Sequence, residues 1–106
     1  MKGRRASARN RWRAWRLAAH NRAAATHCFY CGVGFEGTGA RQRTVDHRMA
    51  RGQGGSDGLA NLVFACRSCN QRKGSRAEQD FMSSEWLAQR RRDVEQAVTV
   101  RRPPAP

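Results

Sequence analysis

Cys28-Phe-Tyr-Cys31 and Cys66-Arg-Ser-Cys69 are two cysteine pairs with the same spacing, and together they use every cysteine of the chain. Four thiolates in two such pairs can form a closed tetrahedral metal site with bonds of about 2.3 Å. Zinc suits this site because it has no redox chemistry and binds thiolates well. A redox-active C-x-x-C motif and two disulfides are the alternatives, but neither explains two identical spacings in a chain this poor in core residues. We therefore expect one structural Zn²⁺ at these four cysteines.

The chain needs a stabilising site of this kind because it has little material for a hydrophobic core. It has 106 residues and no isoleucine, and 16 of its residues are alanine, whereas leucine, valine and phenylalanine together number 14. This composition, with a net charge of +13, is typical of disordered chains. Short chains that do fold generally rely on a metal, disulfides or a partner. A structural zinc site contributes roughly 10 kcal/mol or more of folding free energy.

Two features of the apolar pattern bear on location. No apolar run approaches the roughly 20 residues that a membrane-spanning helix needs, and no apolar segment follows the basic residues of positions 1–16, as a secretory signal would require. We therefore expect no membrane association and a cytoplasmic location, in a bacterium or a phage-infected cell. Thiols are kept reduced there, which favours metal binding over disulfide formation.

Positive charge is concentrated in the first three quarters of the chain. Residues 1–76 contain 16 Lys and Arg against three acidic residues, whereas residues 77–106 contain five of each. Nineteen of the 21 basic residues are arginine, whose planar guanidinium suits phosphate. An arginine-rich composition can also reflect a GC-rich genome. The uneven distribution nevertheless favours a polyanionic partner, and we expect a monomer that binds the phosphate backbone of double-stranded DNA.

A basic helix is predicted over residues 4–25, which are rich in alanine and arginine and contain neither glycine nor proline. Trp12, Trp15 and Ala19 fall on one side of this helix. In one interpretation the tryptophans pack onto the domain while the arginines are solvated. In the other the helix lies along DNA. Both interpretations hold if the tryptophans and the arginines lie on different faces of the helix. The arginines of this helix that we expect to contact DNA are Arg9, Arg13 and Arg16.

Short strands and turns are predicted in the middle of the chain, where residues 28–58 hold eight of the ten glycines. Residues 42–48 and 61–65 are the candidate strands because they contain β-branched and aromatic residues. The glycine-rich loop between them is not a P-loop, since the Gly-Lys-Ser/Thr ending is missing. A helix should follow from Arg67 and end at Gly74.

Further helix is predicted after Gly74. Ser75 and Glu78 have the spacing of a capping box at a helix start, and a break is expected at Ser83-Ser84. We thus expect four segments: a basic helical extension (1–26), a zinc-stabilised core (27–74), a helical C-terminal segment (75–100) and a flexible tail (101–106).

The order and spacing of motifs over residues 28–74 resemble those of HNH endonucleases. The matching positions are the cysteine pairs, Asp46-His47, Gly54-Gly55, Asn61-Leu62-Val63 and Asn70-x-x-Lys73-Gly74. The resemblance implies a small α+β fold with a ββα-metal, treble-clef-like core, braced by the four-cysteine zinc site and flanked by the basic N-terminal helix and C-terminal helices. The chain departs from the family pattern twice: Asn70 stands where His is commonest, and Ala50 where a proline often follows the catalytic His. Asn is an accepted variant at the first of these positions.

The matching residues also have the chemistry that phosphodiester hydrolysis requires, namely a nucleophilic water and stabilisation of developing charge. His47 is the candidate general base because imidazole titrates near neutral pH. Asp46 and Asn70 offer hard oxygen ligands for one Mg²⁺ or Mn²⁺. A regular strand would place Asp46 and His47 on opposite faces, so they would act from opposite sides of one phosphate unless the strand leaves its regular pleat.

The resemblance also assigns roles to residues around these three. Asn61 is expected to tie down the loop and fix the orientation of the imidazole, so we count it as a catalytic position. Arg67 and Lys73 share a helix face with Asn70 and are candidates for binding a neighbouring DNA phosphate. A metal-dependent DNA endonuclease is thus favoured. Two alternatives stay open, neither of which needs His47: a non-catalytic zinc module that binds nucleic acid, and an adaptor in a phage DNA-packaging machine.

Overall fold

The computed structural model describes residues 8–101 of the chain, and the side chains of residues 10–97. The predicted N-terminal helix is shorter than expected at its C-terminal end: α1 spans Ala8–His20, and a separate 3₁₀ turn follows at Ala23–Ala25. The first residues of that predicted helix, and all but one residue of the predicted tail, lie outside the described residues.

Two antiparallel strands form the centre of the fold. β1 spans Arg43–His47 and β2 spans Leu62–Cys66, with Val45 opposite Phe64 and His47 opposite Leu62. Both predicted strands are therefore confirmed to within one residue at each end. Because side chains alternate along a strand, each strand contributes to two different layers.

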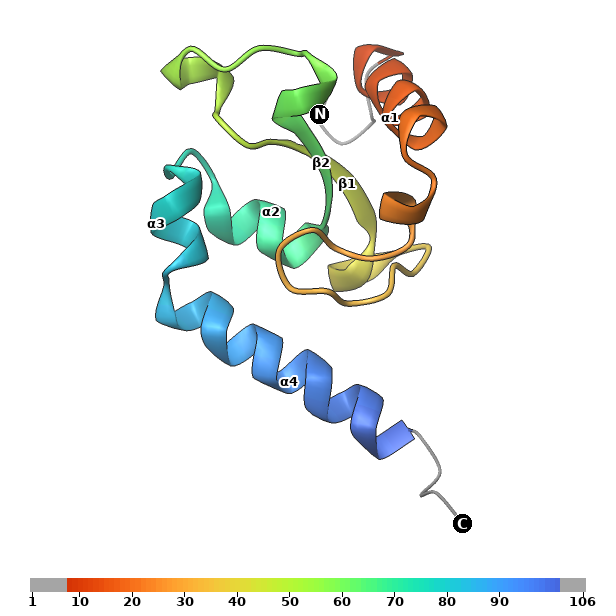
Figure 1. Ribbon diagram of the computed structural model, residues 1–106, viewed down its shortest axis with the longest axis vertical. Helices are drawn as coiled ribbons and strands as arrows, with labels where there is room; N and C mark the ends of the chain where they lie inside the picture. Colours follow the sequence, from red (N-terminus) through yellow and green to blue (C-terminus); the bar gives the residue numbers. More distant parts are fainter. Residues whose placement is uncertain (1–7, 102–106) are drawn as a thin grey trace.

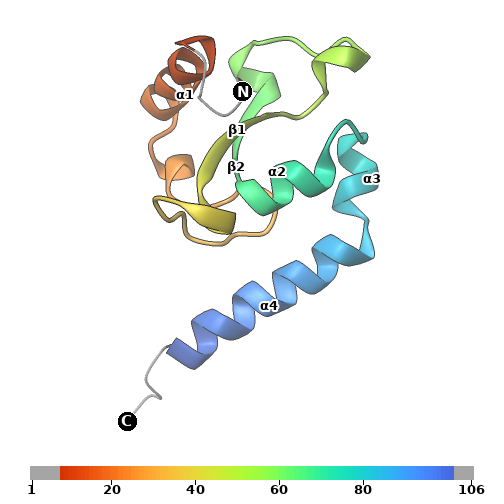
Figure 2. The ribbon, with the colours of Figure 1, turned by 180° about the vertical axis from the view of Figure 1, so that it is seen from behind.

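Helices cover the two faces of this sheet, as Figures 1 and 2 show from opposite sides. α1 packs on one face, where Leu17 joins Leu62 and Phe64 in a small apolar cluster. α2, which spans Arg67–Lys73, covers the other face together with the cysteine pairs. The larger apolar cluster lies on that side, and its members include the four cysteines, Tyr30, Ala65, Phe81 and Leu87.

The start and end of α2 follow from its sequence. Cys66 begins the helix because its sulfur accepts a hydrogen bond from the backbone N–H of Cys69. Gly74 ends the helix at a φ of 53°, a backbone conformation that glycine adopts more readily than other residues. The end predicted at Gly74 is thus confirmed, and it turns the chain toward the C-terminal helices.

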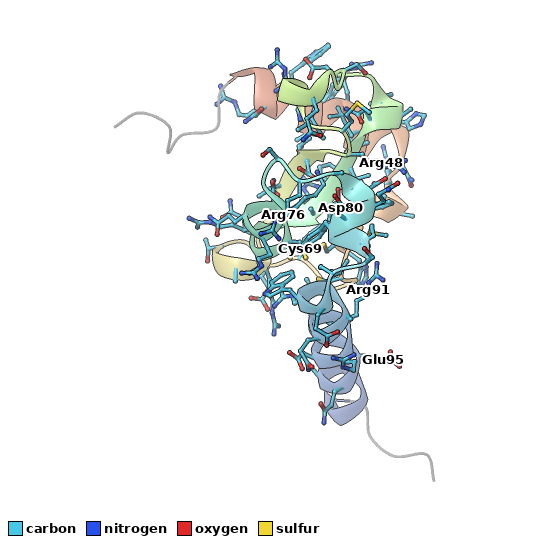
Figure 3. All side chains as sticks on the ribbon, turned by 90° about the vertical axis from the view of Figure 1, so that its left-hand side faces the viewer. Arg48, Cys69, Arg76, Asp80, Arg91 and Glu95 are labelled. Atoms are coloured by element: carbon cyan, nitrogen blue, oxygen red, sulfur yellow. The ribbon has the colours of Figure 1, made fainter. Side chains whose placement is uncertain are left out.

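Two helices complete the fold: α3 spans Glu78–Met82 and α4 spans Glu85–Arg101. The predicted break between them is present, and the Ser84 hydroxyl accepts a hydrogen bond from the N–H of Leu87 in the first turn of α4. The predicted capping box is wrong, because Glu78 is itself the first residue of α3 and its carboxylate pairs with Arg48 instead. The C-terminal part of α4 extends away from the rest of the molecule, as the position of Glu95 in Figure 3 shows.

The architecture is the small α+β fold that the sequence predicted: two antiparallel strands, a following helix, a four-cysteine cluster and helices at both ends. Among residues 8–101, no helix is both long and apolar enough to cross a membrane.

Candidate active site and metal centre

The four cysteines meet at one buried point beside the start of α2. Their Sγ atoms all lie within 4.8 Å of one another, and all four thiols are free. The Sγ atoms of Cys31 and Cys66 are 3.8 Å apart, which matches the edge of about 3.8 Å of a tetrahedron with zinc–sulfur bonds of about 2.3 Å. The donor set and its spacing therefore fit the structural zinc site that the sequence predicted.

Hydrogen-bond donors lie around this cluster. The backbone N–H of Tyr30 points to Cys28 Sγ at 3.3 Å, and a guanidinium nitrogen of Arg90 lies 3.6 Å from Cys66 Sγ. Hydrogen bonding with Cys28 lowers the pKa of Cys31 to about 6, and the pKa of Cys66 is lowered for the same reason. Hydrogen bonding with Cys31 raises the pKa of Cys28, and hydrogen bonding with Cys28 raises that of Cys69. Burial opposes the charge of Arg90, but its hydrogen bonds to the thiols raise its pKa. Arg90 thus offsets part of the negative charge that four thiolates bring.

α4 is tied to the same region by a second arginine. The Nε of Arg91 donates to the carbonyl oxygen of Tyr30 at 2.8 Å. Arg91 lies on the part of α4 that is nearest the body of the molecule (Figure 3). The C-terminal helix therefore belongs to the surroundings of the cysteine centre.

Asp46 lies between β1 and α2, almost fully buried. Its Oδ2 accepts a hydrogen bond of 2.6 Å from the Tyr30 hydroxyl and forms an ion pair with Lys73 Nζ at 3.3 Å. Burial, followed by the hydrogen bond to Asp46, raises the pKa of Tyr30, so its hydroxyl stays a donor. Lys73 Nζ also donates to the carbonyl oxygen of His47 at 2.9 Å. Because Lys73 is 0% exposed, the prediction that it binds a DNA phosphate does not fit its placement.

Asn70 lies on α2 directly after Cys69, so the cysteine centre fixes its position. Its Nδ2 donates to Thr44 Oγ1 at 2.9 Å and to the Val45 carbonyl at 3.3 Å. These hydrogen bonds, and those of Asp46, use neither Asn70 Oδ1 nor Asp46 Oδ1. Both oxygens are ligands of the kind that Mg²⁺ and Mn²⁺ prefer. The oxygens on this side of β1 are of the type that the predicted divalent cation needs, but Asp46 is nearly buried and already pairs with Lys73.

His47 lies on the other face of β1, because successive side chains of a regular strand alternate. Its Nε2 is 2.7 Å from Asp57 Oδ1, and Asp57 Oδ2 accepts a hydrogen bond of 2.9 Å from Arg13. The hydrogen bonds from Arg13 and His47 lower the pKa of Asp57 to about 2. Asp57 is therefore an ionised acceptor, so Nε2 carries a proton, and in the neutral imidazole Nδ1 keeps the lone pair. The contact with Asp57 does not engage Nδ1.

Sequence reasoning missed Asp57, and it assigned Arg13 to DNA. Arg13 is 4% exposed, with its guanidinium held by Asp57 and Asn10, so the prediction that it contacts DNA does not fit the structure. The sequence contained a sign of the position of each residue. Asp57 is the sole acidic residue of the loop between the strands, and Arg13 is one helical turn before the buried Leu17.

Asn61 closes the loop that carries Asp57. Its Oδ1 accepts from the N–H of Met49 at 2.8 Å, and its Nδ2 donates to the carbonyls of Met49 and Ser56 at 3.0 and 2.8 Å. The same loop requires glycine at position 55, where an added Cβ would come within 1.7 Å of the Met49 carbonyl oxygen. Among the described contacts, Asn61 does not touch the imidazole; its hydrogen bonds hold the loop that carries Asp57.

The remaining predicted DNA contacts lie on different elements. Arg67 is exposed on α2, and Arg16 is partly exposed on α1, with its guanidinium 4.6 Å from the ring centroid of Trp12. The side chain of Arg9 lies outside the described residues. A groove of about 360 Å³ runs between α1 and the start of β1, and its lining includes Arg11, Arg43 and Asn70.

Comparison with known proteins assigns the central part of this structure. The family model described as HNH endonuclease matches residues 28–76, which contain both cysteine pairs, both strands and α2. No curated protein matches the chain.

Proposed function

Residues 28–76 form an HNH endonuclease domain, and from this premise we propose that the protein is a metal-dependent endonuclease that hydrolyses phosphodiester bonds of DNA. The observation that carries this proposal is the His47–Asp57 pair. An imidazole held through Nε2 by an ionised carboxylate has its other nitrogen ready to accept a proton. That arrangement suits a general base.

In the proposed reaction, Nδ1 of His47 accepts the proton of the attacking water. Asp57 stabilises the imidazolium that results, and Arg13 keeps Asp57 in place and ionised. General-base catalysis of this kind contributes about 10²–10⁴ in rate.

Asp46 and Asn70 would hold the divalent cation through the Oδ1 atoms that their hydrogen bonds leave unused. A bound divalent cation would neutralise charge that develops on the phosphate and on its leaving oxygen. Because β1 stays regular through His47, the general base and the ligands would act from opposite sides of the strand end. The scissile phosphate would then lie across the end of β1.

The charge of the surface supports DNA as the substrate. The first three quarters of the chain carry the whole net charge of +13, and the groove beside Asn70 is lined by Arg11 and Arg43. Arg67 is exposed on α2, three residues before Asn70, and in this proposal it binds a phosphate next to the scissile one. These contacts are with the backbone and therefore read little sequence.

A plasmid-nicking assay tests the proposal. Zinc-loaded protein should convert supercoiled plasmid to the nicked or linear form only when Mg²⁺ or Mn²⁺ is added. His47→Ala should lose about 10²–10⁴ in rate. His20→Ala, which removes an exposed histidine of α1, is the matched control and should cut like the wild type. If the wild type binds DNA but does not cut it with either cation, the protein is better described as a non-catalytic zinc module.

A further inference from the structure

We propose that Trp12 and Trp15 form a stacking surface for unpaired nucleobases, which selects DNA with single-stranded character. This inference rests on the proposed nuclease function and names its substrate class. The two indoles are called the tryptophan surface below.

The tryptophan surface is exposed although the chain has few large apolar residues. Trp12 is 53% exposed and Trp15 is 68% exposed. The buried side of α1 is occupied instead by Arg13 and Leu17. The third tryptophan, Trp86, packs against Phe81 and is partly buried. Leaving two indoles in solvent forgoes stabilisation that this small core needs, so the pair is better explained by a ligand than by folding.

The charges around the tryptophan surface favour a nucleic acid over a protein or a lipid. Arg16 stacks over the Trp12 ring, and residues 1–35 contain eight basic residues and no acidic one. Aromatic rings beside arginines are the combination that binds single strands: the rings stack on bases while the guanidinium groups bind phosphates.

The exposed indoles further distinguish unpaired bases from a duplex. Inside a duplex each base face is covered by its neighbours, so an indole can stack only on a base at a flap, gap, junction or single strand. Such stacking is sequence-tolerant because every base has a π-face. The surface would therefore respond to the structure of the DNA rather than to its sequence.

Helix α1 joins this surface to the proposed base. One side of the helix carries Trp12 and Trp15, and the other carries Arg13, which binds the Asp57 partner of His47. Unpaired bases stacked outside α1 would thus be held by the same rigid element that braces the general base. Cleavage would then occur close to the unpaired segment.

Binding can be measured without cleavage. The full-length, zinc-loaded His47→Ala protein is titrated, without added divalent cation, with single-stranded oligothymidylate and with a fully paired hairpin duplex. Tryptophan fluorescence and the anisotropy of a dye on the DNA are recorded. Trp12→Leu with Trp15→Leu keeps apolar bulk but removes the rings, and Trp12→Phe with Trp15→Phe keeps a ring. Phe29→Leu alters an exposed aromatic residue outside α1, in the loop between Cys28 and Cys31.

The single strand should quench the exposed tryptophans. The leucine pair should weaken single-strand binding by about tenfold per indole and duplex binding by no more than about twofold. The phenylalanine pair should recover much of the loss, and Phe29→Leu should bind like the parent protein.

Several results would overturn the inference: equal losses on both DNAs, no loss on either, or a phenylalanine pair as weak as the leucine pair. Self-association in sedimentation experiments that the leucine pair abolishes would assign the surface to a second copy instead. The outcome is separate from the proposed nuclease function. If the plasmid assay succeeds and the fluorescence experiment fails, only this inference falls. If the plasmid assay fails and the binding preference holds, the nuclease proposal falls and the surface belongs to a binding module.

Discussion

Asp57→Asn is the substitution that most directly tests the proposed general base. It keeps the size of the side chain but removes its charge. If the amide NH₂ turns toward His47, Nε2 must become the acceptor and the proton moves to Nδ1, where it blocks the base. If the amide oxygen stays in place, the imidazolium loses its ionised partner. Both outcomes lower the rate of the chemical step and leave DNA binding unchanged.

The expected magnitude follows from the geometry. Loss of Asp57 cannot cost more than loss of His47 itself, which sets an upper limit of about 10²–10⁴. The corresponding change in Ser–His–Asp triads, where the carboxylate is buried, costs about 10⁴ in kcat. The Asp57 side chain is 39% exposed, so water replaces part of its effect. We expect a loss of about 10- to 100-fold in the single-turnover rate.

The assay is single-turnover cleavage of plasmid at saturating Mn²⁺, followed across pH. Asp80→Asn, which alters an exposed carboxylate on α3, is the matched control. Arg13→Met provides a second test, because Arg13 acts on His47 only through Asp57 and should add little to the loss in the Asp57→Asn protein. An unchanged rate and pH profile for Asp57→Asn would refute the reasoning. It would also be refuted if the loss of rate in the double variant equalled the product of the losses in the two single variants.

Three further predictions concern the metals and the buried lysine. Cys66→Ser should lose the bound zinc, measured by elemental analysis, and the cooperative thermal transition with it; a zinc-free protein that melts cooperatively would contradict the structural role of zinc. Asn70→Ala should need more Mg²⁺ for half-maximal cleavage, whereas its neighbour Gln71→Ala should not. Asn70→His should shift the preference toward Mn²⁺, Co²⁺ or Ni²⁺, and equal cleavage by Asn70→Ala at limiting Mg²⁺ would exclude Asn70 as a ligand. Lys73→Met should leave its carboxylate partner buried without an ion pair and lower the free energy of unfolding by about 3 kcal/mol in urea titrations, while Arg67→Met on the same helix should change it little.

The central part of the fold could be predicted because its determinants are local. The two cysteines of each pair are separated by only two residues. The strands β1 and β2 contain β-branched and aromatic residues, which favour extended structure. Gly74 ends α2, as predicted from the wide range of backbone conformations that glycine can adopt. Such features depend on residues that are close in the sequence, so they can be predicted from the sequence alone.

The contacts of the candidate site depend on neighbours in space and were harder to predict. The segment between His47 and Asp57 is a glycine-rich loop, and its path is set by the hydrogen bonds of Asn61. Arg13 was assigned to DNA because arginine is usually solvated, yet here it has a carboxylate partner that is 44 residues away. Glu78 failed to form a capping box because Arg48, 30 residues earlier, offered a stronger ionic partner.

The contacts made by α1 and α4 have a consequence for the order in which the protein can mature. A ribosome releases Arg13 long before Asp57, and the cysteine centre cannot close until Cys69 has followed. α4, which brings Arg90 to the thiolates, follows Cys69 in the chain and is released after it. A nascent or prematurely terminated chain therefore presents its basic helix to the cell before its histidine has a braced partner. Because α4 brings Arg90 and Leu87 to the cysteine centre, a product that ends before α4 would lack part of the surroundings of the four sulfur atoms.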